Sequence, residues 1–143
     1  TNTQKQATQL SNDFLNELAE LRSKYAKSSL IPIFYYSWTA PLMTIGPNAW
    51  GNQLLNVCGA QTLFADSPVD YPQVALKDVL TRQPHALIAA SKSTHSELEV
   101  FWRDHRSFLK APLIVVDPDV TSRFSLRLIN ELKVLCKGIK ESA

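Results

Sequence analysis

The sequence lacks the features that mark nucleotide-dependent enzymes and membrane proteins. Only four of its 143 residues are glycine, and no two of them stand in the G-x-G spacing of a phosphate-binding loop. No apolar stretch approaches the roughly eighteen residues of a membrane span. The segment Thr1–Leu10 is polar where a signal peptide is charged and then apolar. We therefore expect neither a nucleotide site nor a membrane-spanning helix.

Charged and metal-binding residues are scattered along the chain. Fifteen Lys and Arg against thirteen Asp and Glu give a net charge of +2, with no basic run long enough to follow a phosphate backbone. The histidines His85, His95 and His105 do not cluster, and the G-x-S-x-G elbow of hydrolases is absent. We expect no nucleic-acid partner, no metal site and no catalytic residue.

The cysteine content is low and leaves two interpretations open. Cys58 and Cys136 each fall near the end of an expected helix, in "LLNVCG" and "LKVLCK", without a CxxC pair. They are either two buried thiols or the halves of a disulfide. A bridge closing 78 residues (136 minus 58) would stabilise the fold by about 4 kcal/mol in the chain-entropy model. It would also indicate an oxidising compartment.

The length and the hydrophobic pattern predict one α/β domain, or one lobe of a larger protein. We expect helices at about 4–27, 48–59, 74–83, 93–105 and 122–140, and strands at 30–36, 61–65, 85–90 and 111–117. Asn48 is a candidate N-cap and Gly59 a candidate C-cap of the second helix. Strands that alternate with helices through short loops favour a mostly parallel sheet with helices on both faces.

Ligands of such sheets meet the loops beyond the carboxyl ends of the strands. Three loops follow strands here, at residues 37–47, 66–73 and 117–122. Their candidate binding residues are Trp38, Pro41 and Met43 in the first, Tyr71 in the second, and Asp117, Asp119 and Arg123 in the third. An apolar and aromatic surface with a few polar groups is typical of a small-molecule site. The alternatives are a half-buried Trp38 that only packs and a local ion pair between Asp119 and Arg123.

The run "NQLLNVCGAQTLFADSPVDYPQV" (52–74), followed by "VLTRQPHALIAA" (79–90), resembles the carboxyl-terminal lobe of periplasmic cobalamin-binding proteins. This family delivers cobalamin to ABC importers of the cobalamin and iron-siderophore type. The resemblance covers nearly the whole chain and implies a Rossmann-like lobe with a central, mostly parallel sheet. Residues 1–28 resemble the helix that connects the two lobes of the family, and residues 29–143 resemble the second lobe.

The resemblance implies a role for each matching position. Tyr71 takes the place of an aromatic residue that packs on the corrin ring. Asp119 and Arg123 match an acid and an arginine that hydrogen-bond the amide side chains of the corrin. Trp38, Pro41 or Met43 would supply apolar contacts, and Cys58 and Cys136 match a family disulfide.

Further implications concern partners and location. In the family, an acidic residue after the aromatic docks on the transporter, but Lys77 stands at the aligned position here, with Asp78 beside it. Docking through Asp78 is therefore a hypothesis. The resemblance implies a periplasmic binding protein with no enzymatic activity and no cofactor, whose partners are cobalamin and the membrane subunits of an importer. Because nothing matches the amino-terminal lobe, we expect half a binding site.

Two alternatives concern the ligand and the class of protein. Another large ligand, a siderophore or haem, fits the same class, and Tyr71 could ligate haem iron. The absence of a basic cluster favours an amide-rich corrinoid over an anionic siderophore. An enzyme on a doubly wound sheet is the alternative from a different class, and it would need the glycine-rich loop that this sequence lacks.

Overall fold

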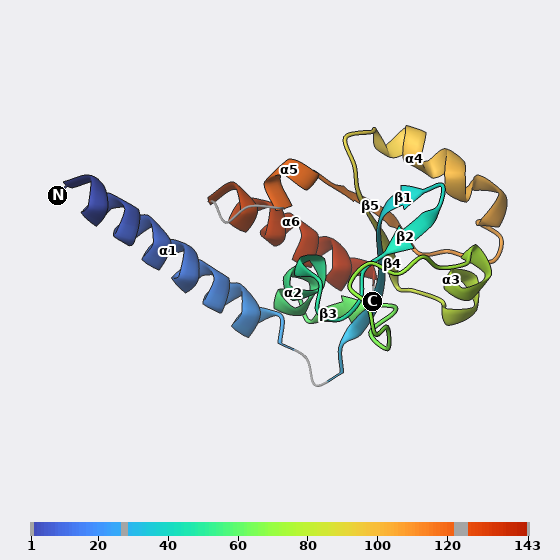
Figure 1. Cartoon of the computed structure of the whole chain (residues 1–143), viewed down its shortest axis with the longest axis horizontal. Helices are drawn as coiled ribbons and strands as arrows, with labels where there is room; N and C mark the ends of the chain where they lie inside the picture. Colours follow the sequence, from blue (N-terminus) through green and yellow to red (C-terminus); the bar gives the residue numbers. More distant parts are fainter. Residues whose placement is uncertain (1, 27–28, 122–125, 143) are drawn as a thin grey trace.

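The computed structural model describes residues 2–26, 29–121 and 126–142, with the side chains of 2–11 and 126 left out (Figure 1). Its elements are α1 (Asn2–Lys24), β1 (Ile31–Thr39), β2 (Leu42–Thr44), α2 (Trp50–Val57), β3 (Ala60–Thr62), α3 (Leu76–Arg82), β4 (Ala86–Ala90), α4 (His95–Trp102), the short 3-10 helix η1 (Arg103–His105), β5 (Leu113–Val116), α5 (Pro118–Thr121) and α6 (Leu126–Ser142).

The sheet is mostly parallel, as the alternation of strands and helices predicts. Its order is β2-β1-β4-β5, and β3 pairs with the first half of β1. The pairings of β1 with β3, β1 with β4, and β4 with β5 are parallel. Only β2 runs antiparallel to its partner, β1. The predicted α/β fold class is confirmed.

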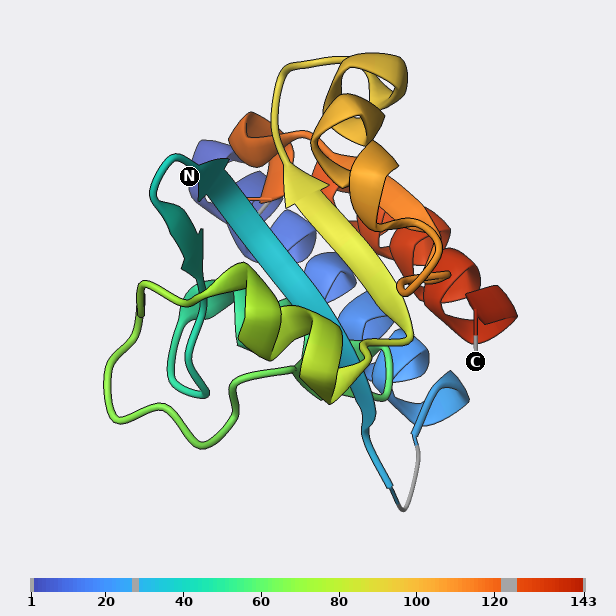
Figure 2. The same ribbon diagram turned by 90° about the vertical axis from the view of Figure 1, so that its right-hand side faces the viewer.

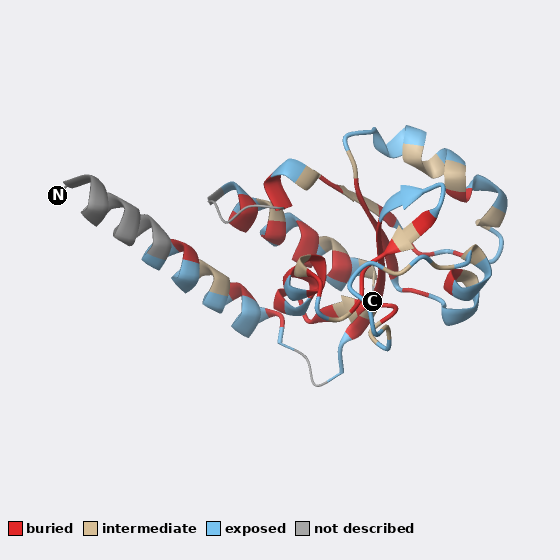
Figure 3. Ribbon diagram, in the orientation of Figure 1, coloured by how far each residue is buried: buried red, intermediate tan, exposed pale blue. Residues whose placement is uncertain are grey.

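Helices cover both faces of the sheet (Figure 2), with α3 and α4 in front and α1 and α6 behind. Successive side chains of β1 enter opposite faces. Ile33 and Tyr35 join the core beneath α1, α2 and α6, whereas Phe34 and Tyr36 join the core beneath α3 and α4. On the second face, the indole N–H of the fully buried Trp102 donates a 2.9 Å hydrogen bond to the Tyr36 hydroxyl. The interior therefore has two apolar layers, one on each face of the sheet. Figure 3 shows in red the buried residues of the strands and helices.

The ends of the helices show which of the predicted capping residues are correct. Thr94 caps α4, because its hydroxyl accepts a 3.2 Å hydrogen bond from the Glu97 amide. The predicted cap at Asn48 is wrong: Ala49 occupies the N-cap of α2 without a side-chain hydrogen bond. The C-cap of α2 is Cys58, one residue before the predicted Gly59, and Gly59 follows it with φ of 74°, a left-handed conformation that suits glycine.

The segment 37–47 is not the loop that the sequence predicts. β1 continues to Thr39, and β2 returns beside it after a cis Ala40–Pro41 peptide. The hydroxyl of Thr44 donates a 2.6 Å hydrogen bond to the Tyr35 carbonyl and helps to hold the hairpin. A strand of three residues next to a proline is too short to show an alternating pattern, which explains the error.

A disulfide joins the helices behind the sheet. Cys58, just after α2, is bonded to Cys136 in α6, and both residues are buried. The disulfide alternative is therefore confirmed. α1 contacts both α2 and α6 through its later turns, and its amino-terminal turns extend away from the sheet (Figure 1).

Candidate functional site

Three parallel strands end side by side at one edge of the sheet, which we call the carboxyl edge. In the register, Tyr36 pairs with Ala89 and Ala89 pairs with Val115, so the ends of β1, β4 and β5 are aligned. The segments that follow carry most of the candidate residues. This is the position at which open parallel sheets bind their ligands.

Tyr71 lies in the segment of residues 63–75 between β3 and α3, which we call the Tyr71 loop. The end of this loop is hydrogen-bonded to the hairpin along β2: Gly46 N–H donates to the Asp70 carbonyl at 2.7 Å, and Thr44 N–H donates to the Pro72 carbonyl at 3.1 Å. Val74 N–H then donates to the Leu42 carbonyl at 3.0 Å. The backbone on both sides of Tyr71 is therefore fixed to the sheet.

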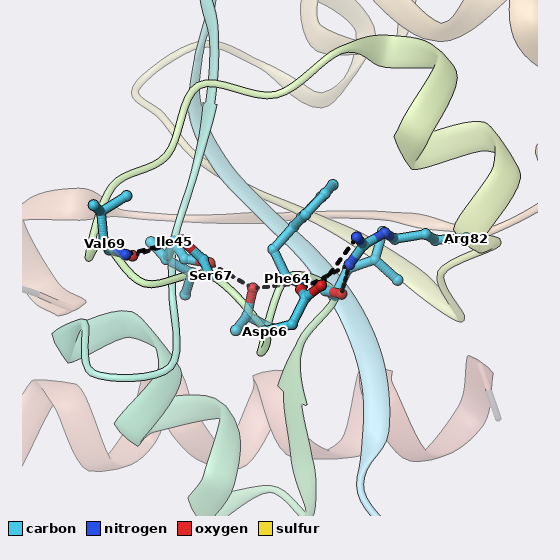
Figure 4. A network of polar contacts seen from close by, with 8 residues as sticks. Ile45, Phe64, Asp66, Ser67, Val69 and Arg82 are labelled. Atoms are coloured by element: carbon cyan, nitrogen blue, oxygen red, sulfur yellow. Dashed lines mark hydrogen bonds and ion pairs between the residues drawn. The ribbon is translucent and has the colours of Figure 1, made fainter.

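The start of the Tyr71 loop is held by a network of polar contacts (Figure 4). The Thr62 hydroxyl donates to the Ile45 carbonyl at 2.7 Å and accepts from Phe64 N–H at 3.2 Å. Ser67 closes a small turn, because its hydroxyl donates to the Val69 carbonyl and accepts from the Val69 N–H. The loop therefore has a defined backbone although it contains no helix or strand.

The Tyr71 side chain is 62% exposed, so its ring offers a free face to a ligand. The buried Tyr35 of β1 shares a hydrogen bond between its hydroxyl and the Thr121 side chain in α5. Burial raises the pKa of Tyr35, the bond to Thr121 lowers it, and the nearby Tyr71 raises it. The Thr121 carbonyl also accepts a 2.5 Å hydrogen bond from the Trp50 indole. Thr121 thus joins α5 to Tyr35 of β1 and to Trp50 of α2.

The first group of candidate residues lies on the hairpin. Trp38 is 68% exposed, which excludes the half-buried packing role considered for it. Pro41 is exposed and Met43 is partly buried. Met43 also forms an isolated bridge with Gln73, two residues after Tyr71. The hairpin and the Tyr71 loop are therefore neighbours, which places their exposed aromatic residues on adjoining segments.

Two acidic groups after β5 pair with a lysine that lies after β4. Lys92 Nζ lies 2.8 Å from an oxygen of Asp117 and 2.9 Å from an oxygen of Asp119. The Asp117 carboxylate also accepts a 2.9 Å hydrogen bond from the Asp119 backbone N–H. The hydrogen bond to Asp117 raises the pKa of Lys92 and lowers the pKa of Asp117. Asp119 is exposed and pairs with Lys92.

Sequence reasoning missed Lys92, Tyr35 and Thr121. Lys92 lies two residues after the last residue of the apolar strand β4, Ala90, and this place at a carboxyl end was the available signal. Arg123 lies outside the described residues, so its predicted role stays a prediction. The same holds for the local ion pair considered between Asp119 and Arg123.

The proposed docking residues lie apart from these groups. Lys77 and Asp78 are exposed in the first turn of α3. α3 begins directly after the Tyr71 loop. Both side chains can therefore reach a partner, and their role stays a prediction.

Residues 2–26, 29–121 and 126–142 contain no group of at least three His, Cys, Asp or Glu side chains with a geometry that could hold a metal ion. None of the helices in these ranges combines the length and the hydropathy that a membrane crossing needs.

Comparison with known proteins identifies relatives for almost all of the chain. No protein-family model matches it. A vitamin B12-binding protein of Salmonella choleraesuis is 35% identical over 136 residues, which cover 94% of this chain and 50% of the relative. The periplasmic vitamin B12-binding protein BtuF of Vibrio cholerae superposes with a TM-score of 0.77 at 28% identity, covering 92% of this chain and 52% of that one.

This chain is similar to the carboxyl-terminal lobe of a vitamin B12-binding protein. The resemblance that the sequence carries is thereby confirmed. The chain spans about half the length of the vitamin B12-binding proteins that it matches. A possible iron-binding protein of Staphylococcus epidermidis, with a TM-score of 0.80 at 22% identity over 97% of this chain and 57% of that one, shares the fold.

Proposed function

We propose that this chain is the ligand-binding lobe of a periplasmic substrate-binding protein that binds cobalamin and delivers it to an ABC importer. The observation that carries the proposal is the similarity of 94% of the chain to vitamin B12-binding proteins. The exposed aromatic residues on adjoining segments support it, since a corrin ring offers a broad apolar face. The role is binding and transport, with no chemical step and no resident cofactor.

In this proposal, Tyr71 packs its exposed ring against the corrin. Trp38 adds a second aromatic surface from the hairpin, with Pro41 and Met43 as further apolar contacts. A rigid loop serves this purpose well, because little conformational freedom remains to be lost when the ligand binds. The hydrogen bonds that flank Tyr71 provide that rigidity.

Polar groups at the carboxyl edge bind the amide side chains of the corrin. Asp119 accepts hydrogen bonds from amide N–H groups, and Lys92 holds the carboxylate in place for them. Arg123 is the proposed donor to amide carbonyls. These contacts discriminate between ligands that carry amides and ligands that carry carboxylates.

A siderophore or haem is the second candidate ligand. Tyr71 could ligate haem iron, and a haem-binding protein of Vibrio cholerae shares the fold with a TM-score of 0.78 at 11% identity. Lys92 is the cation that the structure describes closest to Asp117 and Asp119, and both aspartates neutralise it. An anionic ligand therefore gains little there, which favours the amide-rich corrinoid.

The proposal extends to the other lobe and to the importer. Residues 1–28 connect this lobe, residues 29–143, to an amino-terminal lobe that closes the site. A protein carrying both lobes is expected to bind cyanocobalamin more tightly than these 143 residues; equal affinity would contradict this arrangement. Asp78, with Lys77 beside it, docks on the importer, and an unchanged transport rate in Asp78→Ala would exclude that role.

Isothermal titration of cyanocobalamin into the chain tests the ligand and the aromatic contact together. Tyr71→Ala is expected to weaken binding tenfold or more, about 1.4 kcal/mol. Phe108→Ala is the matched control, because Phe108 is also an exposed aromatic residue, 72% accessible, but follows η1. Equal losses in both variants, or no binding by any of the three proteins, would count against the proposal.

A further inference from the structure

A single arginine from α3 holds the first residues of the Tyr71 loop (Figure 4). The two terminal nitrogens of Arg82 donate to the two oxygens of Asp66, at 2.9 and 3.2 Å. The Arg82 nitrogen that makes the 2.9 Å bond also donates to the Leu63 carbonyl at 3.2 Å. The guanidinium carbon lies 4.4 Å from the centroid of the Phe64 ring. One side chain thus contacts three residues of the loop.

The geometry of these contacts indicates an orienting role. The side chains of Arg82 and Asp66 are 39% and 70% exposed, and an ion pair this exposed adds little to global stability. The hydrogen bond between them raises the pKa of Arg82 and lowers the pKa of Asp66. A planar guanidinium that makes a bidentate bond and also lies over a ring fixes direction as well as distance.

Arg82 completes the fixation of the loop. The end of the loop is bonded to β2 on both sides of Tyr71, and Ser67 closes the turn in its middle. Arg82 holds the beginning together with Thr62, whose hydroxyl accepts from the Phe64 N–H. Because the Tyr71 ring is 62% exposed, packing contributes little to its direction, and the backbone of the loop must supply it.

We infer that Arg82 is a positioning residue for Tyr71: it holds the Tyr71 loop in the conformation that presents the ring to a flat, apolar ligand. The inference rests on the proposed function for the identity of the ligand. It does not require Arg82 to touch that ligand. It assigns to α3 the task of setting the aromatic contact surface from behind.

A double-mutant cycle tests the inference, with cyanocobalamin as the probe. Arg82→Gln is expected to weaken binding roughly threefold or more, while Arg82→Gln in a Tyr71→Ala background changes affinity little, because neighbouring residues that act together are non-additive. Arg103→Gln is the matched control, since Arg103 is exposed and forms no ion pair within the described part of the chain. Additive losses in the cycle would overturn the inference.

Amide hydrogen exchange tests the same inference without any ligand. Arg82→Gln is expected to speed exchange at the amides of Gly46, Thr44 and Val74, which pair the hairpin with the loop, roughly threefold or more. The Ser91 amide, bonded to the Val116 carbonyl, is the internal reference. Unchanged exchange at the first three amides would overturn the inference. If Arg82→Gln speeds exchange at these amides but the parent chain does not bind cyanocobalamin, the positioning role is supported and the proposed ligand is contradicted.

Discussion

The amide of Gly46 donates a 2.7 Å hydrogen bond to the carbonyl oxygen of Asp70, the residue before Tyr71. The close approach of the two backbones depends on glycine, because a Cβ at position 46 would lie 2.1 Å from the Val69 carbonyl oxygen. The Val69 carbonyl cannot move far from this position, since it also accepts a hydrogen bond from the Ser67 hydroxyl. Gly46 is thus the point at which the hairpin and the Tyr71 loop meet.

Gly46→Ala is therefore expected to push the Tyr71 loop away from β2 and to lower the free energy of unfolding by about 2 kcal/mol. Gly138→Ala is the control: its added Cβ would meet the end of the Ile114 side chain at 3.0 Å, and such a terminal group can shift at smaller cost. Urea denaturation measures both. An equal or larger loss at position 138 would contradict this account of Gly46.

Asn52 is a buried polar residue with both ends of its amide satisfied. Its nitrogen donates to the Pro47 carbonyl at 2.9 Å, and its oxygen accepts from Thr62 N–H at 2.7 Å. Asn52→Ala leaves both backbone groups unpaired and is expected to cost about 2 kcal/mol of stability. Asn56→Ala, at an exposed site on the same helix, is expected to cost far less in urea denaturation. Similar losses in both variants would contradict the structural role of Asn52.

The Cys58–Cys136 disulfide closes a loop of 78 residues between α2 and α6. Reduction is expected to lower the free energy of unfolding by about 4 kcal/mol, because the unfolded chain regains conformational freedom. Dithiothreitol is expected to leave the unfolding midpoint of the double variant, Cys58→Ala with Cys136→Ala, unchanged. A parent chain whose unfolding midpoint is the same after full reduction would show that the bridge contributes nothing.

The ion pair between Glu99 and Arg106 is expected to make the stability of the fold fall at acid pH. Arg106 hydrogen-bonds both oxygens of the Glu99 carboxylate, and this pairing lowers the pKa of Glu99 below its ordinary value of 4.5. The stability from the pair is therefore complete above about pH 4.5 and is lost as the pH falls through the lower pKa of the folded state. Glu99→Gln should cost roughly 1 kcal/mol at pH 7 and flatten the loss of stability below pH 4.5.

Asp104→Asn supplies the comparison, because Asp104 is exposed and has no ion pair among the residues that the structure describes. Its substitution is expected to leave the acid limb of a urea denaturation series unchanged. An acid limb that is just as steep in Glu99→Gln as in the parent chain would exclude the pair as its source.

The sequence predicts the order of the elements well because long periodic segments carry strong signals. The helix capped by Thr94 and the apolar strand β4 lie where the pattern places them. The sequence missed β2, the true start of α2, and α5, which forms within the segment 117–122 that was expected to be a loop. A strand of three residues forms because Thr44 and Gly46 bond to distant backbone groups, and local periodicity does not contain such partners.

In the candidate site, too, local sequence predicts some features, whereas others depend on contacts between distant residues. The loop with Tyr71 was identifiable because loops after parallel strands are where ligands bind. The contacts that organise it join residues far apart in the chain: Lys92 with Asp117, and Arg82 with Asp66, 16 residues away. A single sequence shows each residue type but not these pairs. The roles of Lys92, Tyr35 and Arg82 therefore came only from the structure.

We propose that the exposed residues around Tyr71 and at the carboxyl edge bind a corrinoid. Nuclear magnetic resonance of the isotopically labelled chain during titration with cyanocobalamin tests it most directly, because shifts locate even weak binding. The account predicts changes at Trp38, Tyr71, Lys92 and Asp119, and none around Phe108. No change at any residue, or changes confined to α4 and η1, would contradict it.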